Sequence, residues 1–532
     1  MKNRTIQKYY SFLSKSFPVL CATGGLRYLP AARDAAGRFD LLEDFSPKAL
    51  RKITEKIRRF RDDFRAMATR SEGWDKARAR ALALNADGLL LELTANEPWK
   101  RSPALYLKTA FDGIRHALEK PCDSPRKLNS RLAKRLKAVP GLLACSQEHL
   151  DAVTTVSRAT AQTMTRDCAR YINTIATEPP FSSEPKLRSL LDGCLEALRE
   201  FDRFVSTRPQ VTQAQGPPLE DVLRYGLGTD ASVDDIRIIA KKQWQKSLDT
   251  LDEIASEHFP GRNWQDVLAG LEPDDIPDPR EAFGESMEEL RGILSGKAFP
   301  GMLRDRGLEV RTPPPYAMSL SLTAFYEPPG TRSGDPAILF VHPEAFAVAD
   351  HGKTKHRRAA LEYRHIAAGL GYPGSHLLET VKLSLDDPVL GQVRNPLSSW
   401  GWRTFAETIP ERLGLMEDPV QRLLLHRRLL RRAASAFIET SLHSESLDQD
   451  HCVAMLTQAG YGKEESLRVL RNMMLEPGER IASVLGRFQL ERLYERYADG
   501  DLAYFCRTVL ECGEAPFDLA EAALRTGTFK SG

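Results

Sequence analysis

Apolar residues recur at intervals of three and four along most of this chain, and this spacing restricts it to a mainly α-helical fold. The pattern is clear after Ser46, where a capping serine and a proline at the first helical position precede Leu50, Ile53 and Ile57. Such a stripe covers one side of a helix, where it can be buried. The same spacing predicts helices over residues 74–95, 103–119, 147–176, 185–206, 233–258, 281–295, 357–368, 421–438, 462–475 and 480–497.

Two short stretches alternate instead with the period of a strand. They are "YAMSLSLTAFY" (316–326) and "AILFVHP" (337–343), each bounded by proline and glycine, so we expect them to pair in a small β element. The clearest linker is "STRPQVTQAQGPP" (206–218), which is polar, aperiodic and contains three prolines. The sequence therefore predicts an N-terminal helical portion over residues 1–215 and a C-terminal portion over residues 216–532.

Charge and cysteine content exclude several classes of protein. The 532 residues include 75 Lys and Arg and 72 Asp and Glu, which gives a net charge of +3. A charge this small gives no whole-chain attraction to nucleic acid or an anionic membrane. The eight cysteines contain no C-x-x-C pair, which favours a reduced, cytoplasmic protein. No apolar run reaches the roughly 18 residues of a membrane span. Lys15 and Ser16 interrupt the first apolar patch, so we do not expect a cleaved signal peptide.

Two helical segments, residues 124–139 and 426–435, are rich in basic residues. A solvated helix face explains such runs, because the stems of basic side chains cover apolar surface. No aromatic residues are interleaved to stack on bases. Nucleic-acid binding is therefore a less favoured hypothesis, and it would show itself by a steep dependence of binding on salt.

The stretch "YRHIAAGLGYPGSHLLE" (363–379) matches the spacing of a phosphate-binding loop. Gly369, Gly371 and Gly374 satisfy G-x-G-x-x-G. That loop follows a strand and donates its amides to a pyrophosphate. Here the preceding residues have helical spacing, and Pro373 removes one amide donor. The sequence does not favour a nucleotide site.

The same region pairs carboxylates with histidines at the i,i+3 spacing of one helix face. Glu362 precedes His365, and His376 precedes Glu379. Zinc accepts ligands of both kinds. However, the chain contains no H-E-x-x-H, and solvated polar groups on a helix account for the same residues.

Four blocks of the chain follow one another as in a known family: "GLGYPGSHLLE" (369–379), "WGWRTFAE" (400–407), "RLLLHRRLLRRAASAFIETSLH" (422–443) and "EPGERIASVLG" (476–486). Upstream, "FYEPPG" (325–330) and "ILFVHPEAF" (338–346) match as well. Through these blocks residues 219–500 resemble the bacterial family named domain of unknown function 885, which is similar to helical zinc peptidases of the thermostable-carboxypeptidase and angiotensin-converting-enzyme kind. The resemblance implies a helical zincin-like scaffold with a central cleft and a zinc motif H-E-x-x-P-G-H.

The resemblance also identifies chemical groups that this chain lacks. Gly369 and Ser375 stand at the family's two zinc histidines, and Leu370 stands at its general-base glutamate. Trp400 replaces the glutamate expected as the third ligand, and Ser483 replaces a tyrosine expected to donate to an oxyanion. Zinc needs imidazole, carboxylate or thiolate ligands, and without metal and base no water is activated. We therefore expect no bound cofactor, although the family resemblance implies zinc.

The residues left around the implied cleft define the predicted function. His443 matches the family's histidine in the third block, and Glu439 replaces its aspartate. With these two, His376, Trp400 and Trp402 are the candidates to line the cleft, although helix-end polarity and core packing also explain residues of this kind. The prediction is a catalytically inactive zinc-peptidase-like protein that binds a peptide or protein partner in its cleft. We do not expect a membrane to be among its partners.

The alternative hypothesis is a working metal-dependent hydrolase or peptidase with a relocated site. The residues available for such a site are Glu362, His365, His376, Glu379 and His443.

Overall fold

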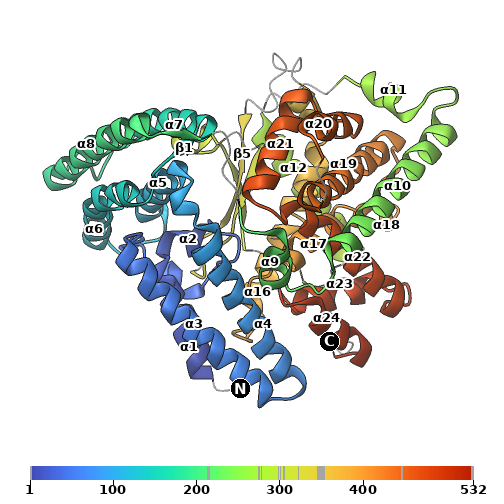
Figure 1. Ribbon diagram of the computed structural model, residues 1–532, viewed down its shortest axis with the longest axis horizontal. Coiled ribbons are helices and arrows are strands. Elements are labelled where there is room, and N and C mark those ends of the chain that lie inside the picture. Colours follow the sequence, from blue (N-terminus) through green and yellow to red (C-terminus); the bar gives the residue numbers. More distant parts are fainter. Residues whose placement is uncertain are drawn as a thin grey trace. The chain divides into compact units, whose positions relative to one another are not determined.

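A computed structural model of the chain was obtained (Figure 1). The structure describes residues 3–211, 216–272, 276, 278–297, 299, 301–302, 306–320, 323–332, 334–343, 354–444 and 447–528. Parts of three predicted segments therefore lie outside the described residues: 212–215 of the linker, 321–322 of the first strand and 344–346 of an upstream family block. Helices account for 71% of the chain and strands for 3%, which confirms the mainly α class. Within the described ranges, no helix combines the length and the apolar character needed to cross a membrane.

The chain divides into two compact units, which we call unit 1 and unit 2. Unit 1 contains Met1–Gln215, Arg311–Leu322 and Glu327–Phe340. Unit 2 contains Gly216–Val310, Thr323–Tyr326 and Val341–Gly532. The first division thus falls within the polar 206–218 segment, and two short stretches later in the sequence return to unit 1.

Unit 1 consists of helices that pack in pairs, such as α3 along α4 and α6 along α8 (Figure 1). The helix predicted after Ser46 forms as expected: the serine hydroxyl accepts a hydrogen bond from the Ala49 amide, and Leu50, Ile53 and Ile57 are buried. The helices of unit 1 are α1 (Asn3–Ser16), α2 (Pro18–Thr23), α3 (Pro47–Thr69), α4 (Gly73–Leu91), α5 (Pro103–Glu119), α6 (Pro125–Ala144), α7 (Thr155–Ile175), α8 (Pro185–Thr207) and α13 (Pro315–Met318).

A buried ionic cluster ties the returning segment Glu327–Phe340 to α5. The Glu327 carboxylate accepts from the Arg115 guanidinium and lies 3.1 Å from the His116 Nε2. The Lys120 ammonium donates to Asp335 at 2.6 Å. Burial alone would raise the pKa of Glu327, but the charge of Arg115, the hydrogen bond with His116 and the charge of Lys120 outweigh it and hold that pKa well below its ordinary range. The segment is therefore fixed in unit 1 by charge as well as by apolar packing.

Among the residues that the structure describes, strands are short and form two small sheets. β1 (Val153–Thr154) pairs in parallel with β2 (Gln210–Val211). β5 (Ala337–Val341) lies between β3 (Leu308–Arg311) and β4 (Ala324–Glu327). The two predicted strand runs are therefore neighbours, as expected, but the first is wrong at its start: α13 occupies residues 315–318, because Pro315 takes the first position of a helical turn.

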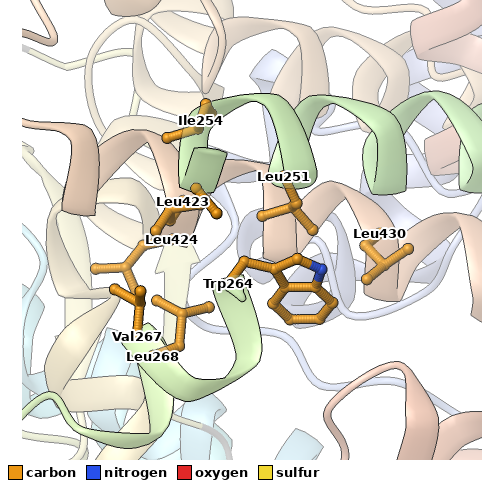
Figure 2. Packing of buried hydrophobic residues seen from close by; sticks show 9 residues of the cluster. Leu251, Ile254, Trp264, Val267, Leu268, Leu423, Leu424 and Leu430 are labelled. Carbon is orange, nitrogen blue, oxygen red and sulfur yellow. The ribbon is translucent and has the colours of Figure 1, made fainter. Parts of the chain in front are cut away.

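Unit 2 is organised around the long helix α19, which lies beside α10 (Figure 1). Leu423, Leu424 and Leu430 of α19 are buried against residues of α10 and α11, and the Trp264 ring lies among them (Figure 2). The helices of unit 2 are α9 (Leu219–Asp221), α10 (Val233–His258), α11 (Trp264–Ala269), α12 (Pro279–Lys297), α14 (Thr354–Leu361), α15 (Tyr363–Leu370), α16 (Ser375–Ser384), α17 (Pro396–Ala406), α18 (Ile409–Arg412), α19 (Pro419–Ser444), α20 (Gln449–Gln458), α21 (Lys463–Leu475), α22 (Glu479–Tyr497), α23 (Leu502–Glu511) and α24 (Phe517–Thr526).

Helices α17 and α22 approach each other backbone to backbone. A Cβ added to Gly401 would lie 2.6 Å from the main-chain carbonyl carbon of Gly486 and 2.7 Å from its Cα. Real Cβ atoms do not come this close, so glycine is required at the crossing. The crossing fixes α17, which carries Trp400 and Trp402, against α22.

We expect Gly401→Ala to destabilise the protein by about 1–3 kcal/mol, because the added methyl group would force the two helices apart. The matched control is Gly193→Ala in α8, where a Cβ would meet nothing within 4 Å. That change should be neutral or stabilise the helix by up to about 1 kcal/mol, since alanine has the higher helix propensity. Urea unfolding of both variants measures the difference, and equal stabilities would contradict the close approach.

Candidate functional site

The glycine-rich stretch 369–374 joins two helices, α15 and α16, and does not follow a strand. Its glycines are explained by packing. A Cβ at Gly369 would overlap the Oε1 atom of Glu407, one at Gly371 would overlap the sulfur of Met287, and one at Gly374 would overlap the carbonyl oxygen of Gly369. The spacing that resembles a phosphate-binding loop therefore arises from three close approaches within unit 2.

The carboxylate beside Gly369 is completely buried and held by arginines of α19. Glu407 has no exposed surface. Its oxygens accept from Arg432 at 2.7 and 2.8 Å and from Arg428 at 3.2 Å. Burial alone would raise the pKa of Glu407, but the charges of Arg428 and Arg432 lower it to about 2. Glu407 is therefore a permanent anion at neutral pH.

A second buried carboxylate, that of Glu362, also contacts arginines of α19. Glu362 is 1% exposed and accepts from Arg427 at 2.8 Å, from Arg428 at 2.9 Å and from Arg431 at 2.6 Å. Burial opposes ionisation, but the three guanidiniums, Arg431 first, hold the pKa of Glu362 well below its ordinary range. Arg428 bonds to both Glu362 and Glu407, so it joins the two ion pairs into one network.

The spacing of these arginines along α19 explains the network. Arg427 and Arg431 are four residues apart and both contact Glu362, while Arg428 and Arg432 are four apart and both contact Glu407. Side chains at i and i+4 lie on one face of a helix. The prediction of a solvated face for residues 426–435 is wrong, because these arginines cover buried carboxylates of unit 2.

The network carries more positive than negative charge. We call it the arginine cluster, and its members are Arg358, Glu362, Arg403, Glu407, Arg427, Arg428, Arg431, Arg432 and Glu465. Arg358 pairs with Glu465, and the six guanidiniums and three carboxylates leave a net charge of +3. Burial and the charge of Arg358 lower the pKa of Arg431 to about 10. Burial and the charge of Arg432 lower the pKa of Arg403 to about 10 as well. Such a cluster repels cations and attracts anions.

His365 lies within reach of this cluster but is a weak base. It is 3% exposed and interacts with the main chain of Gln421. Burial and the charge of Arg428 lower its pKa to about 4, so the ring is neutral at pH 7. Its Nε2 has no hydrogen-bond partner in the described structure. Glu362, its predicted partner for a metal, is already bound to three arginines.

The other members of the relocated site lie in different surroundings. His376 has no exposed surface, and its Nδ1 lies 3.0 Å from the Tyr326 hydroxyl. Glu379 lies 3.2 Å from the Lys382 ammonium, which also donates to Glu514 at 2.6 Å. Among the residues that the structure describes, no three His, Cys, Asp or Glu side chains are grouped so that they could hold a metal ion.

Two of the predicted cleft residues serve the fold. Trp402 is 1% exposed, and its indole N–H donates to the carbonyls of Pro373 and Gly374 at 3.1 and 3.2 Å. Glu439 has no exposed surface and accepts from the amides of Gly478 and Ile481 at the start of α22, at 3.0 and 3.1 Å. Trp402 thus fixes the α15–α16 turn, and Glu439 caps α22.

The remaining predicted positions are distributed over unit 2. Leu370 and Ser483 are buried, and the Ser375 hydroxyl donates to the Gly369 carbonyl at 3.3 Å. Trp400 is partly exposed, and the Arg403 guanidinium stacks 5.7 Å from the centre of its ring. His443 is partly buried near the end of α19, and burial lowers its pKa. Trp400 therefore contributes an aromatic ring next to Arg403, a member of the arginine cluster.

Sequence reasoning missed the residues that carry the charge of this site. The signal was present in "RRLLRR", two arginine pairs separated by four positions within an apolar helix, and in the glutamate that ends "WGWRTFAE". A solvated helix seldom places its basic residues on the same faces as its leucines. Arginines that interrupt the apolar stripe of a helix are the feature in the sequence that could have indicated buried carboxylate partners.

We expect Glu407→Gln to lower stability by about 3 kcal/mol at pH 7, because it leaves two buried guanidiniums without their carboxylate. The pKa of Glu407 in the folded protein is about 2, below its ordinary value of 4.5. Its contribution is therefore complete above pH 4.5 and is lost as the pH falls from 4.5 towards 2.

The variant should lose stability less steeply than the wild type across that pH window. Glu196→Gln, at a surface pair whose carboxylate is 54% exposed, is the control and should follow the wild type. Urea unfolding at several pH values measures both effects. Identical pH profiles for Glu407→Gln and the wild type would contradict the buried ion pair.

Two solved structures share this fold. The one described as "the putative lipoprotein from Colwellia psychrerythraea" has a TM-score of 0.71 and 14% identity, and the match covers 99% of this chain and 100% of that chain. The one described as "a putative lipoprotein of unknown function from Shewanella oneidensis" has a TM-score of 0.71 and 13% identity, with 98% of each chain covered. A comparison with curated proteins gave no match. The profile of the family described as "Bacterial protein of unknown function (DUF885)" matches residues 30–524, and the chain therefore belongs to this family.

Proposed function

We propose that this chain is a catalytically inactive, zinc-peptidase-like protein whose arginine cluster binds an acidic group of a peptide or protein partner. The observation that carries the proposal is the arrangement at Gly369. The Glu407 carboxylate occupies the space where a side chain at this position would begin, and Arg428 and Arg432 hold it there. A zinc ligand at position 369 would have to displace the Glu407 carboxylate from this network.

The chemistry of the cluster supports a role without catalysis. A divalent cation would enter a region with a net charge of +3, which Coulomb repulsion opposes. A general base works best when its pKa lies near the working pH. The pKa values of Glu407 and His365 are about 2 and about 4, and that of Glu362 is also well below neutral pH, so none of them removes a proton efficiently at pH 7.

The same charge favours an acidic ligand. Guanidiniums present paired N–H donors that match a carboxylate, and such charge-assisted hydrogen bonds are among the strongest in proteins. Arg403 and Arg432 are both partly exposed, and the side chain of Arg432, at 21%, is more exposed than those of Arg427 and Arg428. Trp400 adds an aromatic surface beside Arg403. A carboxylate next to an apolar side chain, as at the end of a peptide or at Asp and Glu within one, has the matching chemistry.

We expect purified protein to retain far less than one zinc ion per chain after dialysis, and to show no peptide hydrolysis that a chelator abolishes. Elemental analysis and a peptide turnover assay with and without chelator measure both. Stoichiometric zinc together with chelator-sensitive turnover would instead support the relocated hydrolase built from Glu362, His365, His376, Glu379 or His443.

We expect peptides with a free acidic group to bind more tightly than their amidated counterparts, and Arg403→Gln or Arg432→Gln to weaken that binding about tenfold. The matched control is Arg199→Gln, at a guanidinium that is 69% exposed and pairs with Glu196 on the surface. Fluorescence titration across ionic strengths measures the affinity, which should fall as salt screens the charges. Equal affinity for acidic and amidated peptides would remove the proposal.

A further inference from the structure

Unit 1 contains a pocket of about 250 Å³, lined in part by the basic segment 124–139. Its walls are the turn that follows the 3-10 helix η1 (Arg33–Gly37), the α5–α6 connection, one face of α6 and the loop at Arg332. Four basic side chains and two carboxylates line it: Lys127, Arg131, Lys134, Arg332, Asp40 and Asp123. Four positive and two negative charges leave the lining with a net charge of +2.

The two lysines are already paired with the two carboxylates. Lys127 binds Asp123 at 2.7 Å, and Lys134 binds Asp40 at 2.7 Å. The lysine side chains are 66% and 60% exposed, so these pairs belong to the outer part of the lining. The excess charge of the pocket therefore resides on Arg131 and Arg332.

Arg131 is held in place without being neutralised. It is 9% exposed, and its guanidinium donates to the main-chain carbonyls of Ala117, Lys120 and Pro121. These acceptors carry no charge, and within the described ranges no carboxylate forms an ion pair with it. A buried charge of this kind is costly unless something compensates it.

Arg332 supplies a second guanidinium at the same pocket. It is 47% exposed, and its Nη1 lies 3.5 Å from the Pro121 carbonyl and 3.9 Å from Asp123. Arg332 therefore contacts the same α5–α6 connection as Arg131, but keeps donors that can turn towards a ligand. A fixed guanidinium and an adaptable one thus line a single hollow.

We propose that this pocket binds a dianionic phosphate group. A phosphate carries a charge of about −2 near neutral pH and presents three strong acceptor oxygens, which match the net charge of the lining and the guanidinium donors. Pockets for drug-sized ligands begin at roughly 300 Å³, so this one suits inorganic phosphate or a small phosphate monoester. The site is in unit 1 and does not depend on the function proposed for unit 2.

A free thiol in the pocket lining provides the test. Cys122 is partly buried and lines the pocket, while Cys145 is also free and partly buried but is not part of the lining. A bound phosphate group should shield Cys122 from iodoacetamide. Mass spectrometry of the alkylated peptides gives both rates in one sample, so Cys145 serves as an internal control.

The probes are glycerol 3-phosphate, inorganic phosphate, succinate and glycerol. At about ten times the Kd of the bound probe, alkylation of Cys122 should slow about tenfold, because about a tenth of the pockets are then empty, while alkylation of Cys145 is unchanged. Protection by glycerol 3-phosphate alone identifies an ester as the ligand, and equal protection by inorganic phosphate identifies the free ion. Equal protection by succinate or glycerol, or no protection by any probe, would overturn the proposal.

Arg332→Gln should weaken this protection about tenfold, because it removes the adaptable guanidinium. The control is Arg65→Gln, at an unrelated surface pair in unit 1 whose guanidinium is 52% exposed. Both variants change exposed side chains, and thermal unfolding will check that they fold as the wild type does. Undiminished protection in Arg332→Gln would also overturn the assignment of the site.

Discussion

A carboxylate that is removed from water loses its hydration, and in unit 2 the compensation for two such groups comes from one helix. Glu362 and Glu407 are almost completely buried, and four arginines of α19 surround them. Removing either side of such an arrangement leaves a buried charge without a partner, which costs several kcal/mol. The positions of α14, α15, α17 and α19 are therefore coupled, because the two glutamates lie at the ends of α14 and α17.

Helix α19 can serve this purpose because apolar packing also holds it in place. Its leucines at positions 423, 424 and 430 pack with α10 and α11 (Figure 2), while arginines at 427, 428, 431 and 432 point to the carboxylates. An arginine side chain is long and flexible. A fixed helix nevertheless presents four guanidiniums at defined positions along its axis. Glu439, further along the same helix, caps α22 and extends this order to the crossing at Gly401.

Local signals in the sequence predicted the helices well and the site poorly. Caps and spacing located helices such as α3, α8, α10 and α22 to within a few residues, since these features act over one or two turns. The partners of the arginines are 65 and 21 positions away from them, for Arg427 with Glu362 and Arg428 with Glu407. Spacing within one helix cannot reveal such pairs. The sequence therefore predicts a solvated face for the basic run on α19, where the structure has buried ion pairs. It also predicts that Trp402 and Glu439 line a cleft, whereas both hold neighbouring backbone in place.

The absence of a side chain at position 369 and the presence of the Glu407 carboxylate beside it belong to one arrangement. A histidine introduced at Gly369 would meet Glu407, which is held by Arg428 and Arg432. Removing Glu407 as well would expose two guanidiniums, and these would oppose a metal ion more strongly than before. In the proposed role the chain is therefore not one substitution away from a metal site. In that proposed role, the positive charge of the arginine cluster is the property that an acidic partner would recognise.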